Sequence, residues 1–183
     1  MDVVIRAPDP GEVGHLGAVE RDGDRRFAGY EGVPPGLDET TAPAQLERAR
    51  DDGRLWVAVT GGGGGAGAAS DDGAIIGFAV VEEVDGHAHL AQLSVRLAAQ
   101  NRGVGRRLVE AVSEWAGDHG LGTVTLCTFA DVDWNRPLYE HLGFVVLPEG
   151  RWTPGVRARF ESDGRLGLDL GHRVVMELTV PAR

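Results

Sequence analysis

Apolar positions along the chain follow two periods, one typical of strands and one typical of helices. Runs rich in Val, Ile, Leu and Thr predict strands over residues 3–7, 55–60, 74–84, 87–95, 123–129, 144–147 and 174–180. Helical spacing predicts helices over 9–27, 44–50, 104–116 and 137–142. The clearest is the third, in which Val104, Leu108, Val112 and Trp115 share one face. This order predicts an α/β fold with a mixed, mostly antiparallel central sheet flanked by helices.

Two segments interrupt the pattern. Residues 61–73 (GGGGGAGAASDDG) are low in complexity, and we predict a flexible insertion in a hairpin there. Residues 148–171 show no clear period and are predicted to be a long irregular connection between two strands. This connection carries Trp152, Phe160 and several charges, which makes it a candidate lid over a substrate. At 183 residues, a single domain covering 1–183 is expected.

The composition narrows the chemistry. All 18 basic residues are arginine, which excludes a lysine Schiff base, a Walker P-loop and a protein-kinase lysine. The single cysteine, Cys127, excludes an intramolecular disulfide and a cysteine-rich zinc site, and it favours the reducing cytoplasm. No apolar run reaches the length that a bilayer requires, so no membrane partner is expected.

Charge is distributed unevenly along the chain. The net charge of −10 argues against a nucleic-acid partner. Residues 86–109 nevertheless contain four arginines and no Asp or Glu. Either this stretch is a solvated helix start, or it binds an anion while the acidic remainder suits a cationic ligand.

The segment Gln100–Gly105 (QNRGVG) lies between a predicted strand and the clearest helix. Glycines let the backbone approach a ligand closely, and successive amides at a helix N-terminus bind phosphate. Arg102, Arg106 and Arg107 would add charge-assisted contacts to the same anion. A dinucleotide site would require G-x-G-x-x-G, and Leu108 occupies the third glycine position, so the nicotinamide interpretation is rejected.

These residues resemble a known family. Gln100–Gly105 matches the Q/R-x-x-G-x-G/A signature of the GNAT (Gcn5-related N-acetyltransferase) superfamily, and Tyr139–Phe144 matches its Y-x-x-x-G-F element. The opening Ile5–Asp9 is similar to a first strand of that family, so the resemblance extends over essentially the whole chain. It implies that the sheet is splayed between two parallel strands.

The resemblance implies acetyl-coenzyme A as cosubstrate and no metal. The amides of 102–105 would hold its pyrophosphate, and the backbone of Leu93 and Val95 would pair with its pantetheine arm. Many family members carry N-x-x-A-x-x-x-Y, where this chain has Val132 and Asn135, so the asparagine contact is either absent or made from Asn135. The implied cofactor-binding residues are Leu93, Val95, Gln100, Asn101, Arg102, Gly103, Val104, Gly105, Arg106 and Asn135.

Two catalytic residues follow from the same resemblance. Tyr139 would protonate the departing thiolate, although it could instead be a core tyrosine. His89 lies fourteen residues before Gly103, where family members carry a Glu or His general base. Partial burial would lower the pKa of His89 and keep it neutral, although it could be a plain strand residue. The alternative bases are Glu82, Glu83, Asp131 and Asp133.

Three further candidates are weaker. His87 and His89 could bind zinc as H-x-H, but no third ligand has suitable spacing. Cys127 fits a packed small residue better than a nucleophile, because direct transfer requires no acyl-enzyme. Trp134 and Trp152 could line a pocket or pack in the core.

The activity implied is transfer of an acetyl group from acetyl-coenzyme A to a primary amine by direct attack. An acidic protein favours a small cationic acceptor. Two alternatives remain open: a protein or peptide N-acetyltransferase, and a non-catalytic acyl-coenzyme A-binding module. A cytoplasmic location is expected, and a homodimer is left open.

Overall fold

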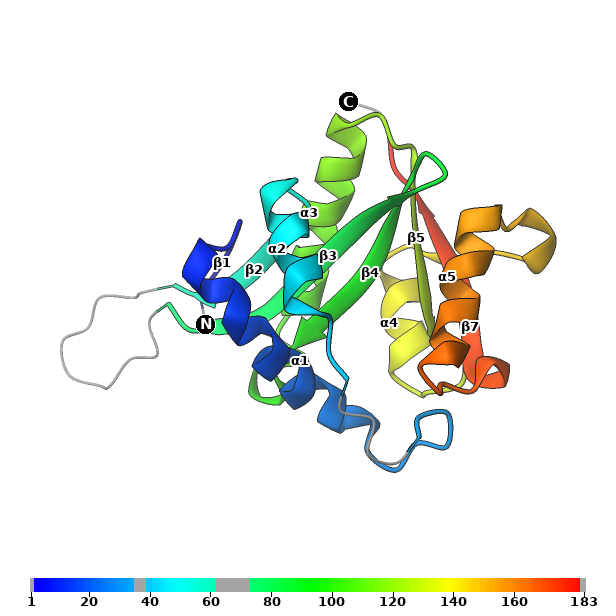
Figure 1. Cartoon of the computed structure of the whole chain (residues 1–183), viewed down its shortest axis with the longest axis horizontal. Helices are drawn as coiled ribbons and strands as arrows, with labels where there is room; N and C mark the ends of the chain where they lie inside the picture. The colour runs from blue at the N-terminus through cyan, green and yellow to red at the C-terminus, as the bar shows by residue number, and fades with distance from the viewer. Residues whose placement is uncertain (1, 35–38, 62–72, 182–183) are drawn as a thin grey trace. The chain divides into compact units, whose positions relative to one another are not determined.

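The computed structural model describes residues 2–34, 39–61 and 73–181. Its strands form one sheet in the order β1-β2-β3-β4-β5-β7-β6 (Figure 1). They are β1 (Val3–Arg6), β2 (Leu55–Thr60), β3 (Ile75–Val84), β4 (His87–Val95), β5 (Thr123–Phe129), β6 (Val145–Val146) and β7 (Arg173–Thr179). β4 and β5 pair in parallel, whereas β1–β2, β2–β3, β5–β7 and β6–β7 pair antiparallel. The predicted fold class, a mixed and mostly antiparallel sheet with flanking helices, is confirmed.

The parallel pairing is short. It joins Ala88–Leu90 of β4 to Val124–Leu126 of β5, although β4 continues to Val95 and β5 to Phe129. Beyond those three positions the two strands are no longer partners in register, as the predicted splay requires.

The chain forms two compact units. Of the described residues, the first unit contains 2–26, 39–61, 73–81 and 92–112. The second unit contains 27–34, 82–91 and 113–181. Strands β3 and β4 are therefore each divided between the units.

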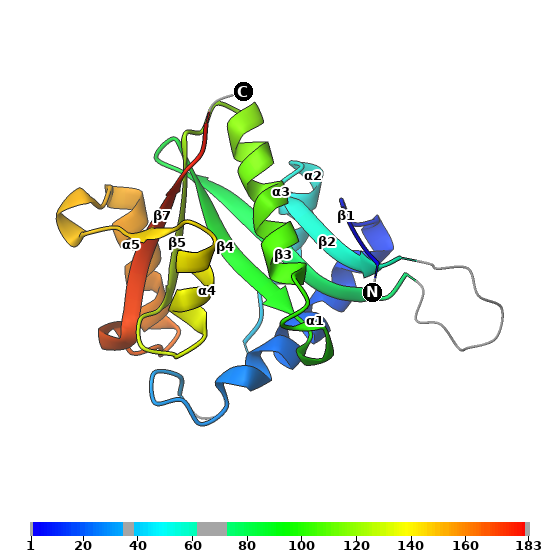
Figure 2. The same cartoon turned by 180° about the vertical axis from the view of Figure 1, so that it is seen from behind.

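The first unit places helices on both faces of its strands. Helices α1 (Leu16–Asp24) and α2 (Pro43–Asp51) cover one face of β1–β3, and the first turns of α3 (Val104–Asp118) cover the other (Figures 1 and 2). A Cβ added to Gly77 of β3 would lie 2.8 Å from the carbonyl oxygen of Ser94 and 3.3 Å from Leu108 of α3. Glycine at this position therefore lets β4 and α3 approach β3 closely.

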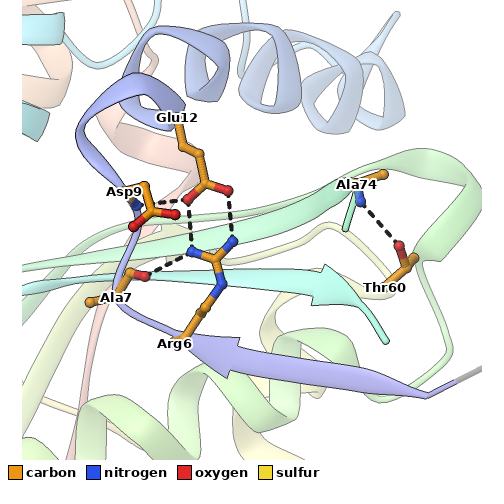
Figure 3. Close-up of polar contacts among 6 residues, drawn as sticks. All are labelled: Arg6, Ala7, Asp9, Glu12, Thr60 and Ala74. Atoms are coloured by element: carbon orange, nitrogen blue, oxygen red, sulfur yellow. Dashed lines mark hydrogen bonds and ion pairs between the residues drawn. The ribbon is translucent and has the colours of Figure 1, made fainter. Parts of the chain in front are cut away.

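The prediction of one continuous helix over 9–27 is wrong, because three shorter helical segments occupy this range. The structure has a 3-10 helix η1 (Pro10–His15), then α1, then a 3-10 turn η2 (Arg25–Phe27). Two glycines within η1, Gly11 and Gly14, lower the preference of this stretch for an α-helix. Figure 3 shows how the segment begins: both Nη atoms of Arg6 donate to Glu12, at 2.7 and 2.6 Å, and the Asp9 amide donates to the same carboxylate at 2.7 Å.

The second unit also has a helix on each side of β5. Adjacent strand residues point to opposite faces. Cys127 packs on a cluster that includes Val156 of α5 (Pro154–Arg165), and Thr128 bonds to Asn135 of α4 (Asn135–His141). Helices α4 and α5 therefore lie on opposite faces of β5 (Figures 1 and 2).

The prediction of an irregular connection over 148–171 is wrong, because α5 forms its central part. The Thr153 hydroxyl accepts a hydrogen bond from the Val156 amide at 3.3 Å, and Pro154 is at the first helical position, so the helix start has a standard cap. Val156 is the one residue of α5 that is fully buried. Trp152 and Phe160 pack against the same cluster, so both aromatic residues of the candidate lid lie against the core. A single buried position leaves too little periodicity to indicate a helix from sequence.

The glycine-rich segment joins two paired strands. β2 and β3 are antiparallel neighbours, and the Ala74 amide donates to the Thr60 hydroxyl at 3.1 Å (Figure 3). The predicted hairpin position of 61–73 agrees with this pairing. Residues 62–72 lie outside the described part of the chain.

Candidate functional site

In the first unit, the turn between β4 and α3 has the backbone geometry that its sequence suggests. Asn101 and Gly103 adopt positive φ values of 59° and 79°, a region that asparagine and glycine tolerate best. Val104 is 1% exposed and anchors the helix start. The first amides of α3 have no acceptor within the helix, and the helix dipole makes this end positive. The turn is therefore chemically suited to an anion.

The 3-10 turn η2, helix α1 and strand β4 hold this turn in place. Arg26 donates from Nη1 to Gln100 Oε1 at 2.9 Å, and Gln100 Nε2 donates to the Val95 carbonyl at 2.9 Å. A Cβ on Gly23 of α1 would lie 2.9 Å from the same Val95 oxygen, so only glycine allows this close approach. The amide of Gln100 is therefore bonded to protein at both ends. One lone pair of the Val95 carbonyl oxygen is thus already used within the protein.

The other predicted cofactor residues of the first unit surround the same turn. Leu93 and Val95 have side-chain atoms 3.9 Å from a Cβ added to Gly105. Arg102 and Arg106 are exposed, and Arg106 donates from Nε to Glu110 at 2.8 Å. The structure thus brings Leu93, Val95 and 100–106 together in one unit, whereas Asn135 belongs to the second unit.

Sequence reasoning missed Glu20 of α1, which is only 5% exposed. Its Oε1 accepts from Gln92 Nε2 at 2.8 Å and from the Thr41 hydroxyl at 3.0 Å, and its Oε2 accepts from the Thr41 amide at 3.0 Å. Burial raises the pKa of Glu20 to about 7, against the opposing effect of the Thr41 hydrogen bonds. A signal was present: Glu20 has helical spacing with Leu16 and adjoins Val19, on the buried face of α1.

His89, the predicted base, is buried in the second unit with 4% exposure. Its Nδ1 lies 2.9 Å from the hydroxyl oxygen of Thr125 on β5. Burial lowers the pKa of His89 to about 4, and the positive charge of Arg159 acts in the same direction. The imidazole is therefore neutral near pH 7, as a general base must be.

Tyr139, the predicted acid, lies on α4 and is 8% exposed. Its ring meets Phe144 edge-on, with ring centroids 5.7 Å apart. Burial raises the pKa of Tyr139 to about 12, so the phenol holds its proton at neutral pH. The residue thus has the protonation state of an acid and the packing of a core tyrosine.

Asn135 begins α4 and is 7% exposed. Its side-chain oxygen accepts from the Thr128 hydroxyl and, at 3.2 Å, from the Phe129 amide. This oxygen therefore satisfies two hydrogen-bond donors at the end of β5. A cofactor contact from Asn135 would have to come from its amide nitrogen.

The four alternative bases differ in their surroundings. Glu82 of β3 forms an ion pair with Arg159 of α5, so its negative charge is balanced. Glu83 and Asp133 are exposed. Neither environment resembles the buried setting of His89.

Asp131 is engaged in a surface network after β5. It accepts from the Tyr30 hydroxyl and lies 2.7 Å from His172 Nδ1. The hydrogen bonds from Tyr30 and His172 lower the pKa of Asp131, and the bond to Asp131 raises the pKa of His172. Trp134 packs nearby on Phe27, with ring centroids 4.8 Å apart.

The remaining candidates have packing roles. Burial raises the pKa of the Cys127 thiol to about 12, which does not favour a nucleophilic thiolate. Within residues 2–34, 39–61 and 73–181, no group of three or more His, Cys, Asp or Glu could hold a metal ion. Over the same residues, no helix is both long and apolar enough to cross a bilayer.

Residues 30–144 match the family described as the acetyltransferase (GNAT) family. This range contains the β4–α3 turn, His89 and Tyr139.

Solved structures share the fold. PaiA N-acetyltransferase from Thermoplasma acidophilum, in complex with coenzyme A, is 16% identical with a TM-score of 0.69, over 98% of this chain and 99% of that chain. The ribosomal-protein-S18-alanine N-acetyltransferase from Escherichia coli is 15% identical with a TM-score of 0.63, over 100% and 96%. N-acetylglutamate synthase from Neisseria gonorrhoeae, with coenzyme A and N-acetyl-glutamate, is 16% identical with a TM-score of 0.70, over 98% of this chain and 35% of that chain. The second name gives a protein alanine and the third gives N-acetyl-glutamate, so the same fold occurs in proteins named for different compounds.

Proposed function

Because this chain belongs to the acetyltransferase (GNAT) family, we propose that it transfers the acetyl group of acetyl-coenzyme A to a primary amine. We propose further that residues 1–183 act as one catalytic domain in the cytoplasm and that the acceptor is a small cationic molecule. The observation that carries the proposal is the β4–α3 turn. It combines the family motif with two positive-φ residues immediately before the N-terminus of α3.

Acetyl-coenzyme A would bind to this turn through its pyrophosphate. The amides of Arg102–Gly105 would donate to the phosphate oxygens, and the exposed guanidinium groups of Arg102 and Arg106 would add positive charge. The backbone of Leu93 and Val95 would pair with the pantetheine arm. In this proposal Gln100 shapes the turn, since both ends of its amide are bonded to protein.

The reaction would be direct attack by a neutral amine. The amine nitrogen bonds to the thioester carbon while His89 accepts the amine proton. The tetrahedral intermediate then collapses, the C–S bond breaks, and the Tyr139 hydroxyl donates its proton to the thiolate. His89 is neutral and Tyr139 is protonated at pH 7, so both begin in the required state. Solvent would later return the proton from His89 to Tyr139.

A cationic acceptor is supported by charge. The chain has a net charge of −10. Within the second unit, the exposed carboxylates of Glu31, Asp131 and Asp169 are close enough to His172 to raise its pKa. An acidic surface raises the local concentration of cations and steers them toward the protein.

The test is a panel of amines with acetyl-coenzyme A as donor, followed by release of free thiol. Diamines and amino sugars represent small cations, and short peptides with free N-termini represent protein acceptors. We expect turnover with small cations. Faster turnover with peptides would replace the acceptor assignment. A thermal shift with coenzyme A but no thiol release on any amine would indicate a binding module.

A further inference from the structure

Four polar residues form a row across the strands of the second unit. His89 of β4 is the register partner of Thr125 of β5, and Thr125 is the partner of Glu177 of β7. Residues directly opposite on neighbouring strands point to the same face of a sheet. His89, Thr125 and Glu177 therefore share one face.

The turn between β3 and β4 adds Glu82 to this row. Its two residues, Asp85 and Gly86, have φ values of 50° and 78°, as in a type I′ two-residue hairpin turn. Such a turn sets the register of its strands: Val84 opposes the first residue of β4, and Glu82 opposes His89. Opposite residues have Cβ atoms about 4.5–5.5 Å apart. Glu82 is therefore the cross-strand neighbour of His89 on the same face of the sheet, and its carboxylate pairs with Arg159.

The hydrogen bonds of Thr125 assign the protons of His89. The Thr125 hydroxyl oxygen lies 3.3 Å from the carbonyl oxygen of Ala88, which can only accept. The hydroxyl proton is therefore directed to Ala88. In the contact of 2.9 Å between Thr125 and His89, the hydroxyl oxygen then accepts and Nδ1 donates. The neutral imidazole carries its hydrogen on Nδ1 and its lone pair on Nε2.

The negative charges of Glu82 and Glu177 on this face are balanced by two arginines from residues 148–171. Arg159 of α5 pairs with Glu82, and Arg151 pairs with Glu177 at 2.6 and 3.2 Å. The positive charge of Arg159 itself disfavours the imidazolium of His89. Without Arg159, the carboxylate of Glu82 on the neighbouring strand would be unbalanced and would favour the imidazolium. The titratable and charged groups on this face or paired with it are Glu82 on β3, His87 on β4, Cys127 on β5, Arg173 and Glu177 on β7, Arg159 and Asp163 on α5, and Arg151 before α5.

We propose that Thr125 and Arg159 are positioning residues for His89. Thr125 holds the imidazole hydrogen on Nδ1, so that Nε2 is the proton acceptor. Arg159 holds Glu82, so that the imidazole stays neutral. This inference rests on the proposed function, in which His89 is the general base, and it assigns to α5 a role in setting the state of that base.

The first experiment reads the tautomer directly. In ¹⁵N-histidine NMR of the full chain, with His89 assigned by its loss in His89→Gln, we expect the shifts of a neutral ring protonated at Nδ1. Thr125→Val retains the β-branched shape but removes the hydroxyl oxygen that accepts from His89 Nδ1. The tautomer of His89 that is protonated at Nε2 should then appear. Thr125→Ser should restore the wild-type spectrum. A wild-type ring protonated at Nε2 would overturn the role of Thr125.

The same variants have a kinetic consequence. Thr125→Val should lower kcat by about tenfold or more, and by no more than the 10²–10⁴-fold that general-base catalysis contributes in total. The KM for acetyl-coenzyme A should stay within about twofold, and Thr125→Ser should recover kcat. Equal falls in kcat for the Val and Ser variants would indicate a packing role instead and overturn the assignment.

The second experiment concerns Arg159. Arg159→Gln should move the NMR titration of His89 to higher pH by one unit or more, together with the acidic limb of the kcat profile. Adding Glu82→Gln should return both toward wild type. Arg157→Gln is the matched control, because Arg157 pairs with Glu149 and should leave the NMR titration of His89 in place. An unmoved titration in Arg159→Gln would overturn the role of Arg159.

Activity of His89→Gln distinguishes a failure of the proposed role of His89 as base from a failure of the positioning roles of Thr125 and Arg159. If His89→Gln keeps full turnover and the wild-type pH profile, His89 is not the base, and the inference falls with that assignment whatever the NMR shows. If His89→Gln loses turnover while the tautomer is wrong or the titration does not move, the positioning roles alone are overturned.

Discussion

Glu20 in the first unit and His89 in the second are titratable side chains buried to almost the same depth, with opposite consequences. Glu20 is 5% exposed and His89 is 4% exposed. Burial disfavours the charged form of any group, so it raises the pKa of the acid to about 7 and lowers the pKa of the base to about 4. Equal burial therefore gives a carboxyl that is partly protonated near pH 7 and an imidazole that is neutral there.

The hydrogen-bond partners separate these two groups further. Glu20 accepts three hydrogen bonds, from Thr41 and Gln92, so its oxygens are used in joining α1 and the segment just before α2 to β4. His89 has one side-chain hydrogen bond, between its Nδ1 and the Thr125 hydroxyl. A group with satisfied oxygens suits a structural role. A neutral ring with a lone pair suits proton transfer. In the proposed function the two units also differ toward ligands: the first would supply backbone amides to acetyl-coenzyme A, and the second would supply the side chains of His89 and Tyr139.

The largest expected effect tests whether the second unit supplies the chemistry. Tyr139→Phe retains the ring contact with Phe144 and removes the proton donor. Turnover should fall about 10²–10⁴-fold, the range for general acid catalysis. The thermal shift produced by coenzyme A should match that of wild type. Unchanged turnover, with chemistry shown to limit the rate, would return Tyr139 to the core.

The next effect is the pH dependence of stability from His89. Its folded pKa is depressed from 6.5 to about 4, so its contribution is fully present above pH 6.5 and is lost as the pH falls toward 4. A shift of this size corresponds to about 3 kcal/mol. The free energy of unfolding of wild type minus that of His89→Gln should fall by this order between pH 7 and 4. Urea titrations at several pH values measure it, and a flat difference contradicts the burial assigned to His89.

Glu20 should show the opposite slope. Its folded pKa is raised from 4.5 to about 7, so its contribution is present below pH 4.5 and is lost as the pH rises toward 7. The expected change is about 2–3 kcal/mol. Wild type minus Glu20→Gln should therefore fall as the pH rises, over nearly the window in which the His89 difference grows. Slopes of the same sign for both variants would break the comparison between the two units.

The smallest effect separates ligand binding from backbone strain. Gly103→Ala forces alanine to a φ of 79°, and Gly120→Ala places the same strain at a φ of 68°, with open space at both positions. Each should cost about 1–2 kcal/mol of stability. Only Gly103→Ala should also weaken coenzyme A binding, by about tenfold or less, as calorimetry would show. Equal affinity in the two variants would remove the turn from the coenzyme site.

The sequence alone determined most of the secondary structure of this protein through short-range patterns. The strands, α2, α3, α4 and the turn Gln100–Gly105 were predictable because each depends on neighbours within a few residues: apolar period, a proline or glycine at an end, and a strand-to-helix junction. The pairing of Gln100–Gly105 with Tyr139–Phe144 was sufficient to identify the family. His89 and Tyr139 were candidates by their spacing from those motifs, and their roles remain predictions.

Tertiary structure decided what depends on distant partners. Helix α5 has one fully buried residue, Val156, so its apolar periodicity is weak. Its packing is completed by the partly buried Trp152 and Phe160, which lie against a cluster that includes residues distant in sequence, such as Val84 and Val175. The burial of Glu20 depends on Thr41 and Gln92, 21 and 72 residues away. The row of Glu82, His89, Thr125 and Glu177 exists only through the register of four strands. Periodicity in sequence records which face of an element is buried, but not which distant element covers it, so the setting of the proposed base had to come from the fold.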